Sequence, residues 1–293
     1  MDAKSADVVV VGGGPAGATV ARLLALQGRR VTLIDACNRR LDRLEVLSPS
    51  SLPVLETLGL TELLSDAVVA RPCAGSRRRN GRSGQLDRLQ FDARLRDLAT
   101  QAGTLFEIGR VRTVERIQGG FGIVVDRKTH TSTIEASLVV DASGRPSFLA
   151  RRLGATKLVS EKLAAERCLL DPGYEPSKAP VWLDFEDCEN GWIYGIHGPD
   201  GRQERWRVRR DAVRGMGPWV NASSSRLSRA AGNGWIAVGD AALAFDPIAS
   251  QGLPNAFSTA LVATGAIVSP LGLVEETVAF YTQAIIATFL NSE

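Results

Sequence analysis

The sequence is poor in residues that bind metals or form covalent cross-links. Its 293 residues include 4 cysteines and 2 histidines, and no two cysteines share a C-x-x-C spacing. These counts argue against a zinc site, a redox dithiol and a disulfide framework, so we expect free thiols and no metal site. The N-terminus enters a hydrophobic run at once, without the cleavage pattern of a secretory signal. Both observations favour a cytoplasmic location.

An excess of charge of one sign is also lacking. There are 35 Lys+Arg against 32 Asp+Glu, which gives a net charge of +3. So small a charge does not predict nucleic acid as the main partner. A long uncharged stretch runs from Pro247 to Val274, but it contains further prolines and side-chain amides that are costly in lipid. We therefore expect no membrane span.

Glycine is abundant, with 29 residues, and it follows the first hydrophobic run closely. Residues 7–11 are continuously apolar, as in a parallel strand buried on both faces. The sequence then reads Gly12-Gly-Gly14-Pro-Ala16-Gly17 and continues as a predicted helix over residues 18–27. A second predicted strand over residues 30–34 ends at Asp35. This is the G-x-G-x-x-G pattern in its strand–helix–strand context.

The motif predicts a dinucleotide site with a role for each residue. Gly12 permits the tight turn, Gly14 lets a pyrophosphate approach the backbone, and Gly17 permits close contact between helix and strand. Ala16 lies in the same loop, beside the helix N-terminus that faces the phosphates. Asp35 accepts the ribose hydroxyls. The pattern alone does not distinguish NAD from FAD.

Two later segments each predict a strand that delivers a carboxylate to a glycine-containing turn. Residues 137–144 end in Asp141 and Gly144, and residues 234–240 end in Gly239 and Asp240. The second segment continues through residues 245–257, a loop that opens a predicted helix. Asp141 and Gly144 also fit a simple turn at the end of a strand, and that alternative stays open.

Together these segments resemble the flavoprotein monooxygenases of the aromatic-hydroxylase and tryptophan-halogenase superfamily. The resemblance implies an α/β fold: a Rossmann-like FAD-binding domain of the GR2 or aromatic-hydroxylase type, with an antiparallel-sheet substrate domain. The implied FAD-binding domain is discontinuous and comprises residues 1–72, 85–158 and 232–293. Residues 159–231, together with 73–84, would form the substrate-binding region.

The resemblance also implies roles for individual residues. Asp240 would lie on the ribityl or phosphate side of FAD. Pro247 to Leu253 would pack on the flavin face near the O2 position, with the backbone N–H groups of Gly252 and Leu253 near the flavin N1–C2=O edge. Arg88 begins a segment similar to the family's R-x-x-F-D-x-x-L helix, whose arginine approaches the FAD. The other implied cofactor contacts are Gly12, Gly14, Ala16, Gly17, Asp35, Asp141, Gly144 and Gly239.

The implied reaction is hydroxylation of an aromatic ring through a flavin C4a-hydroperoxide. O2 would be the co-substrate, and NAD(P)H or a separate flavin reductase would be the reductant. The amino-acid sequences of residues 44–49, 58–60, 191–194 and 246–252 are most similar to those of one branch of this superfamily. Its members hydroxylate a tryptophan of a partner protein during biogenesis of tryptophan-derived quinone cofactors, such as that of quinohemoprotein amine dehydrogenase.

In this interpretation Trp192, Tyr194 and His197 line the substrate side. Pro247, Gly252 and His197 are the candidate catalytic residues, and His197 orients or deprotonates an indole or phenol because its pKa lies near working pH. The alternative is an aromatic strand that faces the core and carries one satisfied histidine.

Other functions stay open at this stage. A small-molecule aromatic hydroxylase fits the same motifs. A halogenase would need W-x-W-x-I-P, from which this sequence departs at Tyr194 and His197, and a lysine that is absent between residues 5 and 127. A flavin-linked reductase of isoprenoid type would need a long aliphatic pocket, whereas Trp182, Trp192 and Tyr194 suggest an aromatic one. A non-catalytic flavin-binding escort protein need not keep a flavin-face loop.

Two arginine clusters, in residues 77–82 and 205–210, bear on possible partners. Arg205, Arg207 and Arg209 alternate like one face of a half-exposed strand. Such clusters are usually solvated, and the alternative is that they dock an acidic protein or the phosphates of NADPH. The sequence passes abruptly from one segment to the next near residues 73–85, 198–220 and 265–275. We therefore expect the natural protein to carry further residues in these loops.

Overall fold

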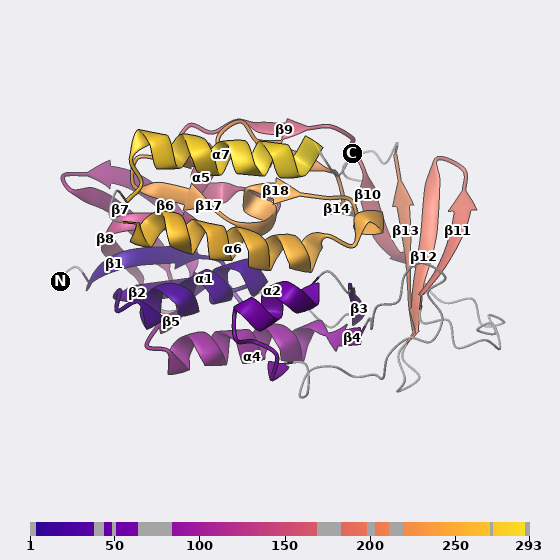
Figure 1. Ribbon diagram of the computed structural model, residues 1–293, viewed down its shortest axis with the longest axis horizontal. Coiled ribbons are helices and arrows are strands. Elements are labelled where there is room, and N and C mark those ends of the chain that lie inside the picture. Colours follow the sequence, from indigo (N-terminus) through magenta and orange to yellow (C-terminus); the bar gives the residue numbers. More distant parts are fainter. Residues whose placement is uncertain are drawn as a thin grey trace.

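The computed structural model describes residues 4–37, 44–48, 51–63, 84–168, 183–197, 203–210, 219–269 and 272–290. The predicted α/β architecture is confirmed: a large mixed sheet carries helices, and a separate antiparallel sheet stands beside it (Figure 1). Arg77 to Arg82 and Trp182 lie outside the described residues, as does the side chain of His197. The division into domains stays a prediction.

The large sheet is built around the first strand that the sequence predicts. Its strands are β1 (Lys4–Val11), β2 (Val31–Asp35), β5 (Leu105–Ile108), β6 (Arg110–Ile117), β7 (Gly120–Asp126), β8 (Thr131–Asp141), β16 (Ala231–Gly232) and β17 (Trp235–Ala237). The order is β16-β17-β8-β1-β2-β5, with β7 beside β8 and β6 beside β7. β1, β2, β5, β8 and β17 run parallel. The turns after β1, β8 and β17 therefore lie at one edge of the sheet.

Helices cover this sheet in a row. They are α1 (Pro15–Leu26), α4 (Arg88–Gln101), α6 (Gly252–Val268) and α7 (Glu275–Leu290), with the shorter α2 (Ser51–Thr57) and α5 (Phe148–Arg152). α1 packs between α4 and α6, and α7 packs on the other side of α6 (Figure 1). Of the described helices, none has the length and apolar character needed to cross a membrane.

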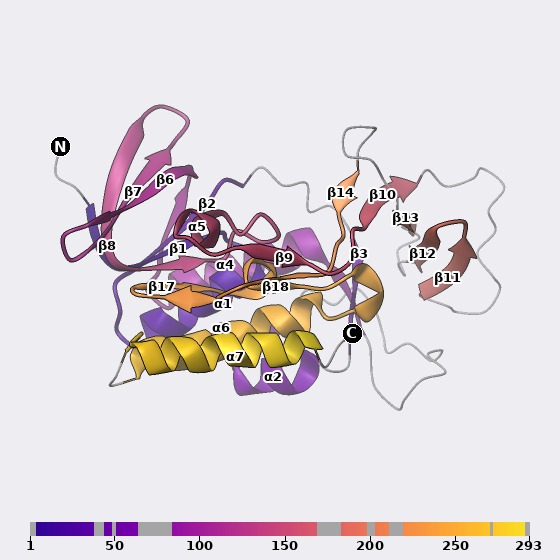
Figure 2. The same ribbon diagram turned by 90° about the horizontal axis from the view of Figure 1, so that it is seen from above.

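Among the described residues, three smaller sheets accompany the large one. A five-stranded antiparallel sheet has the order β11 (Leu183–Cys188), β12 (Gly191–His197), β13 (Gln203–Arg209), β10 (Ala164–Cys168) and β14 (Val220–Asn221). A second has the order β18 (Leu243–Ala244), β15 (Ser225–Leu227) and β9 (Lys157–Val159), and a third pairs β3 (Leu44–Leu47) with β4 (Gly84–Asp87). Figure 2 shows the five-stranded sheet at the far end of the molecule from the β6–β7 hairpin.

The chain enters and leaves the five-stranded sheet along one paired connection. β9 and β10 lead into it, while β14 and β15 lead out and run antiparallel to them. Backbone hydrogen bonds from Ser160 to Ser224 (3.2 Å) and from Ala222 to Leu163 (3.0 Å) continue the pairing between the two sheets. The two crossings therefore form one ribbon.

The main hydrophobic core lies between the large sheet and its helices. Val8, Val9 and Val10 of β1 are buried, as the apolar run predicts. Phe91 of α4 packs edge-on against Phe257 of α6, with ring centroids 6.2 Å apart. The core therefore fixes α4 and α6 against the same edge of the sheet.

Candidate functional site

The loop of residues 12–17, here called the glycine loop, connects β1 to α1. Gly12 has φ +110°, and a Cβ on it would lie 2.2 Å from the carbonyl oxygen of Ala142. A Cβ on Gly17 would lie 1.8 Å from the carbonyl oxygen of Gly12. A Cβ on Gly14 would meet nothing within 4 Å. Close packing thus requires glycine at positions 12 and 17, whereas Gly14 borders open space at the N-terminus of α1.

Asp35 lies at the end of β2, beside the glycine loop. Its carboxylate accepts the backbone N–H of Gly13, and it accepts the N–H of Cys37 at 2.6 Å. Arg96 of α4 donates to the carbonyl oxygen of Gly13 at 3.2 Å. The acid predicted to contact ribose is therefore held at the glycine loop.

The Gly239–Asp240 turn packs directly on this loop. Gly239 begins the short helix η1 (Gly239–Ala241) with φ +57°, and a Cβ on it would lie 2.8 Å from the Cβ of Ala16. The N–H of Gly239 donates to Oγ1 of Thr259 in α6 at 2.8 Å. Motifs at opposite ends of the sequence therefore form one surface, with the half-buried Asp240 side chain beside it.

Residues 245–252 form a loop that opens α6, as predicted. Asp246 caps the short helix η2 (Pro247–Ala249) by accepting the N–H groups of Ile248 (2.8 Å) and Ala249 (3.2 Å). α6 begins at the exposed Gly252, and among the described side chains none caps it. Leu253 is buried. The N-terminus of α6 therefore offers backbone N–H groups and a positive dipole end to an anion.

Asp141 and Gly144 adopt the turn that the sequence left open as an alternative. Asp141 is buried and accepts hydrogen bonds from Ser143 (N–H, 3.0 Å; hydroxyl, 2.6 Å) and from the N–H of Ala150 (2.8 Å). Burial raises the pKa of this carboxyl group, and the hydrogen bonds oppose that rise. Gly144 has φ +73°. These contacts account for Asp141 as a turn residue, and its contact with a cofactor stays a prediction.

Arg88 begins α4 and is engaged by two carboxylates. It donates to both carboxylate oxygens of Asp92 at 3.0 Å and forms an ion pair with Glu45 of β3. Burial alone would lower the Arg88 pKa, but the two acids outweigh burial and raise it. The far side of Glu45 faces α6, because Oε1 lies 4.0 Å from the Cβ position of Gly252. Arg88 therefore reaches the 245–252 loop through Glu45.

The five-stranded sheet presents aromatic side chains on one face. Tyr194 of β12 pairs with Trp206 of β13, and Trp192 pairs with Val208. Trp192 is 8% exposed and belongs to a small apolar cluster, which fits the alternative of a core residue. Tyr194 and Trp206 are half-buried. We call Trp192, Tyr194 and Trp206 the aromatic face.

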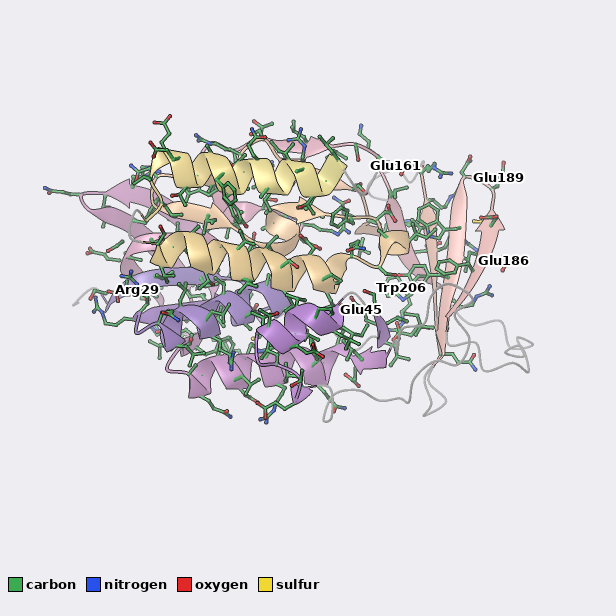
Figure 3. All side chains as sticks on the ribbon, viewed as in Figure 1. Arg29, Glu45, Glu161, Glu186, Glu189 and Trp206 are labelled. Carbon is green, nitrogen blue, oxygen red and sulfur yellow. The ribbon has the colours of Figure 1, made fainter. Side chains whose placement is uncertain are left out.

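A buried carboxylate joins this face to β3. Glu204 accepts the N–H of Leu44 at 2.9 Å and the indole N–H of Trp206 at 3.2 Å, and it forms an ion pair with Arg167 at 3.1 Å. Trp206 therefore lies on the side of the sheet toward Glu45 of β3 (Figure 3). β3 thus lies near the N-terminus of α6 through Glu45 and is joined to the aromatic face through Glu204. The backbone of His197 ends β12.

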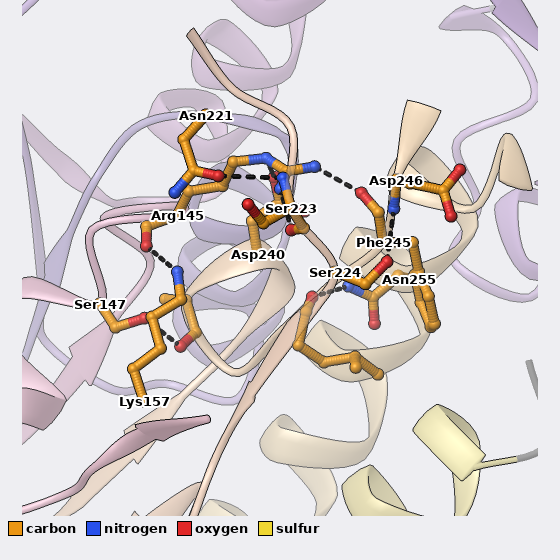
Figure 4. A network of polar contacts seen from close by, with 12 residues as sticks. Arg145, Ser147, Lys157, Asn221, Ser223, Ser224, Asp240, Phe245, Asp246 and Asn255 are labelled. Atoms are coloured by element: carbon orange, nitrogen blue, oxygen red, sulfur yellow. Dashed lines mark hydrogen bonds and ion pairs between the residues drawn. The ribbon is translucent and has the colours of Figure 1, made fainter. Parts of the chain in front are cut away.

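Arg145 connects three segments at the same edge. It donates to the carbonyl oxygens of Ser223 (2.5 Å) and Phe245, and it lies 3.5 Å from a carboxylate oxygen of Asp240 (Figure 4). Sequence reasoning missed this role, as it missed Glu45, Glu204 and Trp206. The one available signal was the alternation of residues 204, 206 and 208 along a strand.

The arginine cluster of β13 faces away from the aromatic side. Arg205, Arg207 and Arg209 alternate with Trp206 and Val208, as predicted for one face of a strand. Arg205 pairs with Glu186 at 2.8 Å and Arg207 with Glu166 at 3.3 Å. Acidic neighbours therefore offset much of this positive charge. Docking of an acidic protein or of NADPH there stays a prediction.

The substitution Glu204→Gln is expected to lower the free energy of unfolding by about 2 kcal/mol, since it weakens two hydrogen bonds to a buried charge and removes its ion pair with Arg167. Glu189→Gln, at an exposed residue of the β11–β12 turn, is the matched control and should change stability by less than about 0.5 kcal/mol. Urea unfolding of both variants, followed by tryptophan fluorescence, measures the difference. Equal stabilities would show that Glu204 contributes nothing to the attachment of the sheet to β3.

Comparisons with known proteins agree with this arrangement. Residues 5–170 match the family described as FAD binding domain. LodB of Marinomonas mediterranea, named as an FAD-dependent oxidoreductase, is 27% identical over 321 residues, which cover 91% of this chain and 85% of LodB. The 6-methylpretetramide 4-monooxygenase of Streptomyces rimosus is 47% identical over 64 residues, which cover 21% of this chain and 15% of that enzyme.

A solved structure gives a match over nearly the whole chain. It is QhpG, a peptidyl tryptophan dihydroxylase essential for tryptophylquinone cofactor biogenesis. The TM-score is 0.77 at 25% sequence identity, and the match covers 98% of this chain and 73% of QhpG. The similarity therefore includes the five-stranded sheet as well as the glycine loop and its helices.

Proposed function

Because the chain belongs to the FAD binding domain family and is an FAD-dependent monooxygenase, we propose that it hydroxylates the side chain of a tryptophan in a partner protein or peptide. The observation that carries this proposal is the position of β3, whose Glu45 lies near the N-terminus of α6 and whose Leu44 is hydrogen-bonded to Glu204 beside the aromatic face. QhpG, which acts on a peptidyl tryptophan, matches the chain across both parts. An aromatic side chain can thus be held against the cofactor.

The residues at the sheet edge fit FAD. Open space at Gly14 suits a pyrophosphate at the N-terminus of α1, and Asp35 beside it suits the ribose hydroxyls. Asp240 would hold the ribityl or phosphate side, with Gly239 and Ala16 packed together behind it. The N–H groups of Gly252 and Leu253 would receive the flavin edge.

When bound, FAD that has been reduced by NAD(P)H or by a flavin reductase supplies activated oxygen from O2 to the ring. The N-terminus of α6 would stabilise negative charge at the flavin edge through its dipole and uncapped N–H groups. Pro247 and Gly252 shape the loop at the O2 position. Trp206 and Tyr194 stack on the substrate ring and exclude water. His197, whose backbone ends β12 and whose side chain lies outside the described residues, is the candidate to orient the ring or take its proton.

Hydroxylation of a small aromatic molecule is the second candidate. The observation that favours it is the 47% identity of a 64-residue segment with 6-methylpretetramide 4-monooxygenase. That segment covers 21% of the chain, whereas the match to QhpG covers 98%. The tryptophan hypothesis therefore has the broader support.

In the test, the flavin of the purified protein is first reduced in the absence of O2, and the protein is then mixed with O2. We expect the flavin to be reoxidised. Stopped-flow absorbance follows reoxidation with and without tryptophan peptides, and mass spectrometry measures added oxygen. We expect an added oxygen atom in the peptide. We also expect H2O2 to be released more slowly in the presence of the peptide than in its absence. Oxygen found in a small phenol and in no peptide would overturn the tryptophan proposal. Absence of bound FAD would overturn the cofactor proposal itself.

A further inference from the structure

We propose that Arg145 is a positioning residue for FAD, which fixes Asp240 and the 245–252 loop in one arrangement. The inference rests on the proposed cofactor contacts of those two elements. Asp240 would hold the middle of FAD, while the loop would hold its flavin. The relative position of the two elements therefore decides whether both parts of one rigidly connected cofactor can be bound together.

The guanidinium of Arg145 contacts both elements directly. Nε lies 3.5 Å from Oδ2 of Asp240, and Nη2 donates to the carbonyl oxygen of Phe245, the first residue of the loop. Nη1 donates to the carbonyl oxygen of Ser223, at the exit from the five-stranded sheet (Figure 4). The Arg145 side chain thus links the turn after β17, the 245–252 loop and the ribbon that leads to the aromatic face.

The backbone that carries Arg145 is itself fixed. Lys157 of β9 donates to the carbonyl oxygen of Arg145, and the hydroxyl of Ser147 donates to the carbonyl oxygen of Ala241 at 2.8 Å. Ala241 directly follows Asp240. The turn after β8 is therefore joined to η1 through the Ser147 hydroxyl as well as through the Arg145 guanidinium.

The chemistry of the position calls for arginine. Three acceptors surround one planar group, and the guanidinium presents N–H donors in fixed directions toward all of them. A lysine ammonium has the charge but lacks this fixed geometry. The side chains of Arg145 and Asp240 are 23% and 35% exposed, so their charges remain open to a bound ligand. The Arg145 charge also offsets part of the negative charge that a diphosphate would bring beside Asp240.

The experiment compares Arg145→Met, Arg145→Lys and Asp240→Asn in the full chain. Arg112→Met is the control for loss of charge, because Arg112 is exposed and pairs with Asp126 on the β6–β7 hairpin. FAD is titrated into the protein freed of flavin, and its fluorescence gives Kd. The visible spectrum of the bound flavin reports its surroundings, and the Tm without FAD reports stability.

Arg145→Met is expected to raise the Kd for FAD by at least about tenfold and to change the flavin spectrum, with Arg145→Lys in between. The double variant Arg145→Met with Asp240→Asn should lose less affinity than the two single losses combined, because Arg145 acts partly through Asp240. A merely structural role would lower the Tm and leave the Kd and the spectrum unchanged.

The proposal is overturned if Arg145→Met binds FAD with the same Kd and spectrum as Arg112→Met. If Arg145→Met does not fold, Arg145→Lys decides by the same two readouts, and wild-type values in it overturn the proposal. In either case the wild-type chain still binds FAD, and the proposed function stands. A wild-type chain that binds no FAD overturns both.

Discussion

Replacement of Gly14 by valine is expected to abolish FAD binding and to leave the chain folded. Gly14 is the N-cap of α1 with φ −76° and ψ −176°, an extended conformation that valine adopts readily. A Cβ there meets nothing within 4 Å, so the protein leaves open space where the side chain begins. The valine side chain would occupy the space proposed for the pyrophosphate. We expect the Kd for FAD to rise by at least about a hundredfold, since the valine excludes the phosphates from the helix N-terminus.

Substitutions at two other glycines serve as controls for this prediction. Gly265→Ala, within α6, also meets nothing within 4 Å and should retain FAD, with stability raised by up to about 1 kcal/mol. Gly17→Ala should disrupt the fold, because its Cβ would lie 1.8 Å from the carbonyl oxygen of Gly12. Circular dichroism measures folding, and fluorescence titration measures FAD binding. Wild-type FAD affinity in Gly14→Val would contradict the proposed pyrophosphate site.

Replacement of Arg88 by methionine is expected to cost about 3 to 5 kcal/mol of stability, the usual result of removing one partner of a buried ion pair. Arg88 is 7% exposed, and Asp92 is 1% exposed. The variant leaves the carboxylate of Asp92 buried without the two N–H donors that now bind it. Thermal and urea unfolding of the flavin-free protein measure the loss.

A second substitution separates the cost of the unpaired charge from the loss of packing. Replacing Asp92 by leucine together with Arg88→Met should recover much of the stability, because both members of the Arg88–Asp92 ion pair are then absent. If the double variant is as unstable as Arg88→Met alone, the buried charge of Asp92 is not the cause. Unchanged stability in Arg88→Met would contradict the structural role assigned to the pair.

The parts of the site that the sequence predicted are those whose neighbours are close in the chain. The glycine loop, the acid at the end of β2 and the loop before α6 each follow from strand, turn and helix patterns within short segments. Gly12 could be assigned to the turn and Gly17 to the helix contact because both roles are local consequences of the motif, whereas the close approach of Gly12 to the carbonyl oxygen of Ala142 was not predicted.

The remaining contacts depend on partners far away in sequence. Arg145 bonds residues 78 and 100 positions away, and Glu204 bonds Leu44 across 160 positions. No local pattern encodes such pairs, because the register of the five-stranded sheet and the packing of β3 decide them. Arg88 shows the same limit. Its place at the start of a helix was predictable, whereas its ion pair with Glu45 of β3 was not.

The paired ribbon that joins the five-stranded sheet to the rest of the molecule bears on how such enzymes diversify. Its two crossings lie side by side and are hydrogen-bonded to each other, so the chain enters and leaves the sheet at one place. Residues between the crossings can lengthen, shorten or be exchanged during evolution without a change in the spacing of the surrounding strands. Recombination at this ribbon would exchange the whole five-stranded sheet between homologues while the strands and helices around the glycine loop are inherited intact.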